Sequence, residues 1–271
     1  MPVGHLQSGA MTDPMSRFSL QGRSILITGA SGAMGSEAAK GLGAVGANVT
    51  IAGGNAEALA ELAATPELAG HCAVAAIRPD SPGEAAAIVQ AAVDAFGRLD
   101  GMLVASGMNI AKPTVDMSLE EWERVMDANV RGSWLMSQAA GRVLLEQGGG
   151  GSIVLVSSTR GKLGHPAGYS AYCPSKAAVD LLAKTLATEW GPQQIRVNAI
   201  APTVFRSELT AWMYEDDERG RTAREAMFAR IPLKRFAEPE DFVGALIYLL
   251  SDASTFLTGQ VVYLDGGYTA C

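Results

Sequence analysis

Cysteine and histidine are scarce in this chain of 271 residues. The three cysteines lie far apart, at positions 72, 173 and 271, and form no CxxC pair. An odd number of cysteines without a framework spacing predicts a reducing compartment, and we expect a cytoplasmic protein. The three histidines are also scattered, so the sequence predicts no metal site.

Positive charge and long apolar runs are lacking as well. Lysine and arginine number 21 against 28 aspartates and glutamates, which gives a net charge of −7. This balance argues against nucleic acid or an anionic membrane surface as a partner. No apolar run reaches the ~18 residues that span a bilayer, and the first residues lack the pattern of a secretory signal. We therefore expect neither a nucleic-acid nor a membrane partner.

Short apolar strands alternate with helices from Phe18 onward. Residues 1–17 are mixed in composition, and we expect a poorly ordered extension there. No composition shift marks a second domain, so residues 18–271 are predicted to form one domain. The alternation predicts an α/β fold with a single doubly wound parallel sheet of about seven strands and helices on both faces. The expected strands are residues 24–27, 48–52, 72–77, 101–105, 152–156, 196–199 and 261–264.

Tyr172 and Lys176 form the most informative pair in the chain. On a helix, residues four apart lie on one face, one turn from each other. A neighbouring ammonium favours the phenolate, so we expect the pKa of Tyr172 to fall from about 10 toward neutrality. Such a tyrosine can exchange a proton with an alcohol or a ketone. The same spacing is common on solvated helix faces, so the pair alone does not establish an active site.

A glycine-rich turn, TGASGAMG at residues 28–35, joins the first expected strand to the first helix. Backbone N–H groups at the start of a helix can bind a pyrophosphate. Gly29 would permit the tight turn, and Gly35 would let the helix lie close to the sheet. Such a turn is equally typical of a packed junction of small residues, so its meaning depends on the other motifs.

Together these motifs resemble the short-chain dehydrogenase/reductase family, in its short single-domain form. The resemblance runs from about Phe18 to the end of the chain. It rests on an ordered set of motifs: TGxxxGxG at 28–35, DANVRG at 127–132, IVLVSSTRG at 153–161, YxxxK at 172–176, RVNAIAP at 196–202, PLKRF at 232–236 and LDGG at 264–267. The resemblance implies a Rossmann fold and an oxidoreductase that uses NAD or NADP. Gluconate 5-dehydrogenase-like members are the most similar to its active-site region.

By this resemblance, four residues carry the catalysis. Tyr172 is the expected acid/base, and Lys176 is expected to lower its pKa and bind the nicotinamide ribose. Ser158 is expected to hydrogen-bond and polarise the substrate oxygen, and Asn129 to hold a water that relays protons. Ser158 lies one residue farther from Tyr172 than the family spacing, which Thr159 matches, but the Ser-Ser-x-x-Gly context favours Ser158.

The family positions also predict a set of nucleotide-binding residues. Ser207 is expected to hydrogen-bond the nicotinamide amide. The full set is Gly29, Ser31, Gly32, Met34, Gly54, Asn55, Gly107, Tyr172, Lys176, Pro202, Val204 and Ser207.

The chain departs from the family pattern at several of these positions. Position 33 is alanine where the family usually has glycine, and Ser106 and Gly107 fall in a stretch where the family has two asparagines, so other bonds must hold that strand end. The second strand ends at Gly53 and Gly54, which provide neither the carboxylate of NAD users nor the arginine of NADP users. Arg78, where the family has an aspartate near the adenine, could reach the nucleotide or lie on the surface. The absence of a basic residue in the glycine turn favours NAD.

The segment 203–230 corresponds to the substrate lid of the family. Trp212 in this segment could cover a substrate, and Arg160, His165 or Arg206 could bind a substrate carboxylate. A polyol, sugar acid or hydroxy acid is the expected substrate. Two alternatives stay open: a 3-oxoacyl-thioester reductase, and a non-catalytic nucleotide-binding redox sensor.

The long helices predicted at residues 119–147 and 172–190 resemble those that pair subunits in this family. The resemblance therefore implies a homo-oligomer, by default a tetramer.

Overall fold

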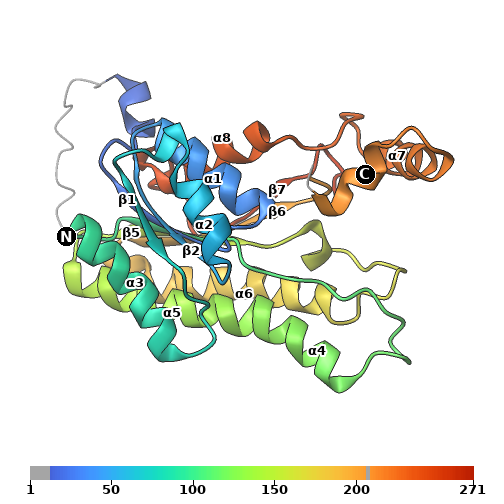
Figure 1. Ribbon diagram of the computed structural model, residues 1–271, viewed down its shortest axis with the longest axis horizontal. Coiled ribbons are helices and arrows are strands. Elements are labelled where there is room, and N and C mark those ends of the chain that lie inside the picture. Colours follow the sequence, from blue (N-terminus) through green and yellow to red (C-terminus); the bar gives the residue numbers. More distant parts are fainter. Residues whose placement is uncertain (1–12, 206–207) are drawn as a thin grey trace, which may run out of the picture.

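A seven-stranded parallel sheet forms the centre of the molecule (Figure 1). The computed structural model describes residues 13–205 and 208–271. The strands follow the order β3-β2-β1-β4-β5-β6-β7, which confirms the predicted doubly wound sheet. Their bounds are β1 Ser24–Thr28, β2 Asn48–Ala52, β3 Cys72–Ala75, β4 Gly101–Val104, β5 Gly151–Val156, β6 Ile195–Pro202 and β7 Val261–Leu264.

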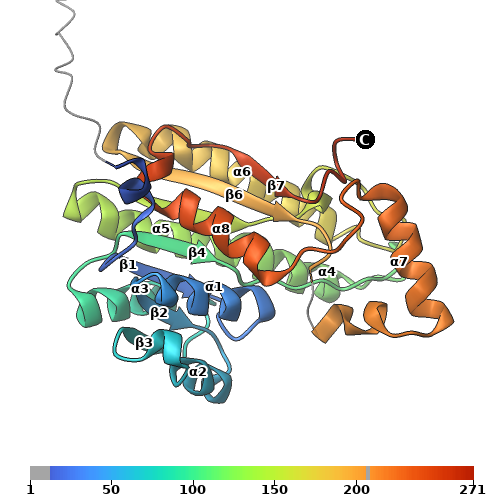
Figure 2. The ribbon, with the colours of Figure 1, turned by 90° about the horizontal axis from the view of Figure 1, so that it is seen from above.

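Helices cover both faces of the sheet, and each face has its own apolar core (Figure 2). One face packs against α1 (Ala33–Ala44), α2 (Ala56–Ala63) and α8 (Pro239–Leu250). The other packs against α3 (Pro82–Phe96), α5 (Gly132–Gln147) and α6 (Tyr172–Trp190). Because both sides are covered, the central strands read as continuous apolar runs rather than as alternating patterns.

The strand order reverses beside β1. The chain proceeds from β1 outward to β2 and β3, then returns to place β4 on the other side of β1. In open α/β sheets, ligands bind in the crevice at such a switch point, outside the carboxyl ends of the strands. The topology therefore predicts a ligand site at the loops that follow β1 and β4.

Part of the segment 1–17, predicted to be a poorly ordered extension, has regular structure. Pro14–Phe18 is a 3-10 helix, capped by the Asp13 carboxylate. The Arg17 guanidinium donates to the Asp252 carbonyl at 2.9 Å and to Thr255 Oγ1 at 2.8 Å. The described part of the predicted extension therefore belongs to the domain, and residues 1–12 lie outside the described residues.

The helix predicted at residues 119–147 has the predicted ends, but it is not a single regular α-helix. The structure divides it into α4 (Leu119–Met126), a π-helical turn (Asp127–Arg131) and α5. The predicted lid segment also contains more structure than expected: a 3-10 stretch (Glu208–Tyr214) and α7 (Glu218–Arg230). Asp217 begins α7 by accepting a hydrogen bond from the Gly220 amide at 2.6 Å, so the acidic run at residues 215–218 contains a helix cap.

None of the helices within residues 13–205 and 208–271 has the length and apolar character needed to cross a membrane.

Candidate active site

The turn between β1 and α1 depends on glycine. Gly29 has a positive φ of 67°, and a Cβ there would lie 2.6 Å from the Ser106 nitrogen. A Cβ at Gly35 would collide with the backbone of Gly29 and Ala30, so α1 can approach the sheet only at a glycine. Gly32 caps α1 without a side-chain hydrogen bond, which leaves the first helical amides available to an anion.

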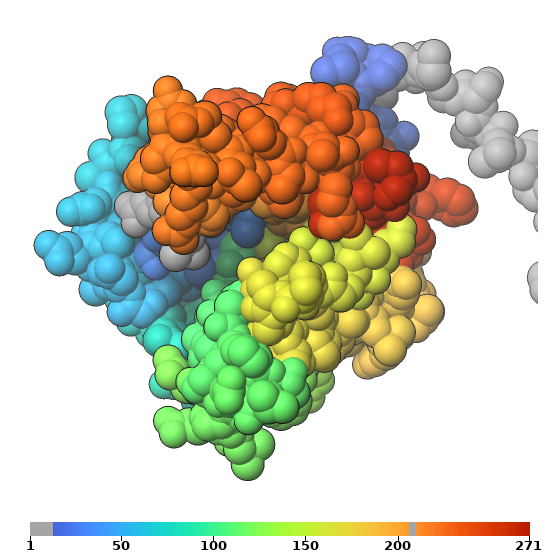
Figure 3. Space-filling view, turned by 90° about the vertical axis from the view of Figure 1, so that its right-hand side faces the viewer, coloured from blue at the N-terminus to red at the C-terminus, as the bar shows by residue number. Residues whose placement is uncertain are grey.

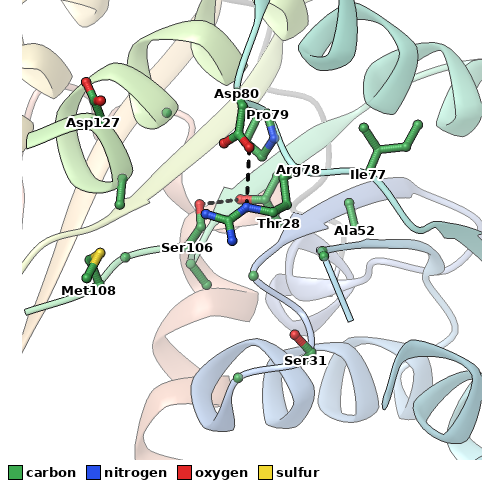
Figure 4. A pocket seen from close by; sticks show the side chains of 18 of the residues that line it. Thr28, Ser31, Ala52, Ile77, Arg78, Pro79, Asp80, Ser106, Met108 and Asp127 are labelled. Atoms are coloured by element: carbon green, nitrogen blue, oxygen red, sulfur yellow. Dashed lines mark hydrogen bonds and ion pairs between the residues drawn. The ribbon is translucent and has the colours of Figure 1, made fainter. Parts of the chain in front are cut away.

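A cavity of about 720 Å³ opens over this turn at the switch point of the sheet (Figure 4). This volume lies in the range of small-molecule and cofactor sites, so the residues present fit a nicotinamide dinucleotide. Five of the predicted nucleotide-binding residues line it: Gly29, Ser31, Gly32, Gly54 and Gly107.

Other predicted nucleotide residues do not line this cavity. The Asn55 carboxamide caps α2 by accepting from the Ala58 amide at 3.1 Å. Met34 packs against the core beneath α1, and Val204 packs against a small cluster around Phe236. Pro202 ends β6, and Ser207 lies outside the described residues.

Arg78 is directed into the cavity rather than lying on a remote surface (Figure 4). Its aliphatic stem crosses Gly54, where an added Cβ would come within 2.7 Å of the Arg78 Cδ. The guanidinium pairs with the Asp80 carboxylate at 3.5 Å, and both side chains are mostly exposed. An exposed ion pair of this kind contributes little free energy, so the Arg78 guanidinium can bind a ligand instead.

The strand end that lacks the two family asparagines is held by other bonds. Thr28 Oγ1 and Ser106 Oγ lie 3.2 Å apart, joining β1 to the loop after β4. Asn129, in the π-helical turn, accepts from the Met108 amide at 2.8 Å and donates to the Met108 carbonyl at 2.9 Å. Sequence reasoning missed Ser106 and Met108, which both line the cavity, because the family pattern offered no equivalent there.

Tyr172 and Ser158 meet at the carboxyl end of β5. Ser158 follows this strand, Tyr172 is the first residue of α6, and the Ser158 hydroxyl lies close enough to the phenol to act on its pKa. The next residue, Thr159, is buried at 1% exposure. The geometry therefore brings Ser158 to the tyrosine despite the unusual spacing in the sequence.

Burial controls the charge state of the catalytic pair. It raises the pKa of Tyr172 above the ordinary value of 10, and the neighbouring Ser158 hydroxyl offsets only part of this rise. Burial also lowers the pKa of the Lys176 ammonium to about 8. The expectation that the pKa of Tyr172 falls toward neutrality is thus wrong for this structure. The ammonium lies 5.7 Å from the centroid of the tyrosine ring and donates to the Val156 carbonyl at 2.8 Å.

Asn129 links the nucleotide cavity to the catalytic helix. Its Nδ2 also donates to Ser175 Oγ at 2.9 Å, one residue before Lys176. A Cβ on Gly107 would lie 3.0 Å from Asn129 Oδ1 and 3.3 Å from Lys176 Nζ, so only a residue without a side chain fits between them. The Asn129 side chain is therefore committed to protein partners, and its role in holding a water stays a prediction.

A cleft opens between the lid and the body of the domain (Figure 3). The Arg160 guanidinium donates to the Gly164 carbonyl at 3.2 Å and to the Tyr268 hydroxyl at 3.1 Å. The His165 ring stacks on Tyr169 at 4.4 Å between centroids. Trp212 packs within the lid, under the guanidinium of Arg219, and Arg206 lies outside the described residues.

Comparison with known proteins agrees with this geometry. The family described as enoyl-(acyl carrier protein) reductase matches residues 29–269. An uncharacterized oxidoreductase of Mycobacterium tuberculosis is 65% identical over 257 residues, which cover 95% of each chain. A short-chain type dehydrogenase/reductase from Mycobacterium marinum has a solved structure that superposes with a TM-score of 0.85 at 33% identity, covering 96% of this chain and all of that one. The chain belongs to the short-chain dehydrogenase/reductase family.

Two further members of this family are similar to the chain and have named activities. A gluconate 5-dehydrogenase of Gluconobacter oxydans is 34% identical over 253 residues, covering 93% of this chain and 96% of its own. The structure of a gluconate 5-dehydrogenase from Burkholderia cenocepacia, in complex with NADP and tartrate, has a TM-score of 0.86 at 29% identity and covers 96% of this chain and 100% of that one. As a short-chain dehydrogenase/reductase, the protein is an NAD(P)-dependent oxidoreductase.

Proposed function

We propose that this enzyme interconverts a secondary alcohol and a ketone, with Tyr172 as the acid/base. The observation that carries the proposal is that the Ser158 and Tyr172 hydroxyls meet at the carboxyl end of β5, with the buried Lys176 ammonium 5.7 Å from the centre of the tyrosine ring. Two hydroxyl groups at one point can both bind a single carbonyl oxygen. The nucleotide cavity opens on the same edge of the sheet, so hydride and proton can be exchanged with one substrate.

Ser158, Tyr172 and Lys176 have different roles in proton transfer. In the reducing direction, the Ser158 and Tyr172 hydroxyls bind the carbonyl oxygen, and the phenol gives up its proton as the oxygen becomes an alcohol. When bound, the nicotinamide supplies the hydride in this direction and accepts it in the other. In the oxidising direction, the Tyr172 phenolate removes the hydroxyl proton, and the Lys176 ammonium stabilises that phenolate.

A polar substrate, such as a polyol, a sugar acid or a hydroxy acid, suits the cleft best. Arg160 and His165 both belong to the loop between β5 and α6, next to Ser158. The gluconate 5-dehydrogenase relatives support the same class, because the substrate in their name carries hydroxyls and a carboxylate. The enzyme uses NAD or NADP, and Arg78, whose side chain crosses Gly54 after β2, has the chemistry to distinguish them.

We also propose that the enzyme is a homo-oligomer, by default a tetramer. Trp134 of α5 and Leu181 of α6 are 45% and 64% exposed, and they line one hollow together with Val130 and Leu182. Exposed apolar surface of this kind, on two adjacent helices, favours pairing with a second copy.

The test of the reaction is nicotinamide turnover, followed by absorbance with NAD and NADP in parallel. The panel holds polyols, sugar acids, hydroxy acids, simple secondary alcohols and a 3-oxoacyl thioester. We expect Tyr172→Phe to lower turnover about 10²- to 10⁴-fold while nucleotide binding persists, because the ring remains and only the proton donor is lost. Equal turnover by the variant would contradict the assigned role. Exclusive turnover of the thioester would replace the polar substrate class with an acyl one.

A further inference from the structure

Two arginines flank Tyr268 at the substrate end of the cleft. Arg160 follows Ser158 by two residues, and Arg230 is the last residue of α7. Their guanidinium carbons lie 5.5 Å and 4.2 Å from the centroid of the Tyr268 ring. Tyr268 itself is 1% exposed and belongs to the small core cluster beneath the lid. A buried aromatic ring therefore contacts two guanidinium groups from separate segments of the chain, the loop between β5 and α6 and the end of α7.

Neither arginine has a carboxylate partner in the part of the chain that the structure describes. The Arg160 side chain donates to one carbonyl and one hydroxyl, which leaves three of its five N–H groups without a protein acceptor. The Arg230 guanidinium makes its contact with the ring face. Several other arginines do pair with acids, among them Arg23, Arg98, Arg131, Arg221 and Arg235.

This arrangement is unusual for a chain with a net charge of −7. Two like charges on one ring repel each other, so the site is stabilised when an anion joins them. Arginine is well suited to this task, since its planar fork matches the oxygens of a carboxylate or a phosphate.

The two arginines are also close to the reacting groups. The Arg160 backbone amide donates to Ser158 Oγ at 3.2 Å, and the Arg160 charge acts to lower the pKa of the Tyr172 phenol. Both arginines lower the pKa of His165, so the two charges reach the same side of the cleft. A ligand bound to these guanidinium groups would extend toward the Ser158–Tyr172 pair.

We propose that Arg160 and Arg230 form a binding site for an anionic group, a carboxylate or a phosphate, at one end of a polyhydroxy substrate. The site narrows the substrate class from polar alcohols in general to sugar acids, hydroxy acids or sugar-alcohol phosphates. This inference rests on the proposed function, because the anion must enter the cleft in which Tyr172 acts. Tyr268 is a positioning residue that fixes the Arg160 guanidinium through its hydroxyl and the Arg230 guanidinium through its ring.

The test compares three ligands that differ at one end: D-glucitol, D-gluconate and D-glucitol 6-phosphate. Affinity is measured by calorimetry on the full chain saturated with the reduced nucleotide that binds it more tightly, so that the alcohols cannot be oxidised. We expect at least one anion to bind about tenfold or more tightly than D-glucitol, and its identity distinguishes carboxylate from phosphate. Equal affinity for all three ligands would overturn the anion site.

Arg160→Gln and Arg230→Gln should each remove most of the preference for the anion and leave the affinity for D-glucitol within about twofold. Arg221→Gln is the matched control, since it makes the same charge change on α7 at a side chain paired with Asp216. Arg230 is exposed, so its replacement is not expected to disturb folding even if that of Arg160 does. A loss of the same size in Arg221→Gln, or an equal loss for D-glucitol in Arg230→Gln, would overturn the proposal.

Turnover separates this inference from the reaction on which it rests. Tyrosine-dependent oxidation of neutral alcohols without a preference for anions would overturn the anion site and leave the reaction standing. Tight anion binding that Arg230→Gln removes, without any Tyr172-dependent turnover, would support the site and contradict the reaction.

Discussion

Lys176 is a buried cation whose charge depends on its surroundings. Its side chain is 4% exposed, and its ammonium has the Val156 carbonyl as a close acceptor at 2.8 Å. Removing a charged amine from water is costly, which is why its pKa falls to about 8. At neutral pH the Lys176 amine is therefore still mostly protonated, and its positive charge can stabilise a phenolate. A rise in pH through 8 removes much of that charge.

This shift predicts a dependence of stability on pH. Between pH 8 and the ordinary lysine value of 10.5, the unfolded chain binds a proton at Lys176 that the folded chain has released. The free energy of unfolding should therefore rise with pH through this window, by up to about 3 kcal/mol from this group, and the gain is lost again as pH falls through 8.

Lys176→Met is the comparison that isolates the effect. We expect the stability of the wild type relative to this variant to increase across the window, measured by denaturant unfolding at fixed protein concentration. A difference that stays constant with pH would mean that the lysine has an ordinary pKa in the folded protein.

Arg78 should influence the choice of nucleotide. Its guanidinium faces the cavity beside Gly54, and no carboxylate lies at the end of β2 to repel a 2′-phosphate. We expect Arg78→Ala to weaken NADP binding about tenfold and NAD binding much less, as measured by titration of each reduced nucleotide.

Gly53→Asp is the converse change. A Cβ at Gly53 would meet only Ser31 Oγ at 3.4 Å and the Leu59 methyls at 3.9 Å, so the site has room for the side chain. The introduced carboxylate should weaken the binding of NADP, whose 2′-phosphate it repels, and leave the binding of NAD nearly unchanged. If Arg78→Ala weakens both nucleotides equally, the guanidinium contacts the adenosine that they share.

The sequence was enough to select the residues that we propose to react, but not to predict their energetics. Tyr172 and Lys176 were selected by their spacing on a helix, and Ser158 by its Ser-Ser-x-x-Gly context. The sign of the pKa shift at Tyr172 depends on burial by distant segments, which no local pattern reports. Likewise, the partnership of Asn129 with the Met108 backbone joins positions 21 residues apart in sequence.

Among the elements, α5 and α6 show how closely helices pack on the face of the sheet opposite α1 and α8. Gly141 of α5 faces Trp190 of α6, and a Cβ there would lie 2.6 Å from the indole ring. Gly141→Ala should therefore destabilise the protein by about 1–3 kcal/mol, because the buried ring cannot move away without cost.

Gly244 in α8 provides a matched control for that substitution. It is exposed, and a Cβ at this position meets nothing within 4 Å. Gly244→Ala should stabilise the protein by about 0.5–1 kcal/mol, since alanine has the higher helix propensity. Opposite shifts of the thermal midpoint would support this account, whereas two shifts of the same sign would contradict it.

Element boundaries were predicted well where an apolar run ends at a turn residue, as in β2 and β7. The division of residues 119–147 was not, because a π-helical turn changes the hydrogen-bonding register without changing the composition. Helix α7 was missed because its charged sequence lacks an apolar stripe, and its cap at Asp217 was hidden within an acidic run.

For the whole molecule, the proposed self-association should depend on the apolar face of α5 and α6. Replacing Trp134 and Leu181 together by glutamate places two buried charges in any interface formed there. We expect the wild type to be an oligomer and the double variant to be a smaller species, as determined by light scattering after size-exclusion chromatography.

Phe256→Glu controls for the loss of exposed apolar surface, since its side chain is fully exposed outside that face. It should leave the oligomer intact. An unchanged mass of the double variant would place the interface, if the wild type has one, on another surface.

The nucleotide cavity and the substrate end of the active site are synthesised at different times, because Tyr268 comes late in the chain. The residues that line the nucleotide cavity lie between positions 28 and 132, so the ribosome makes all of them in the first half of the chain. Tyr268 follows β7 and is translated after every helix and strand of the domain. During translation, the residues of the nucleotide cavity are therefore present long before the Tyr268 ring that positions Arg160 and Arg230. The ability to select a substrate is the last property that the growing chain acquires.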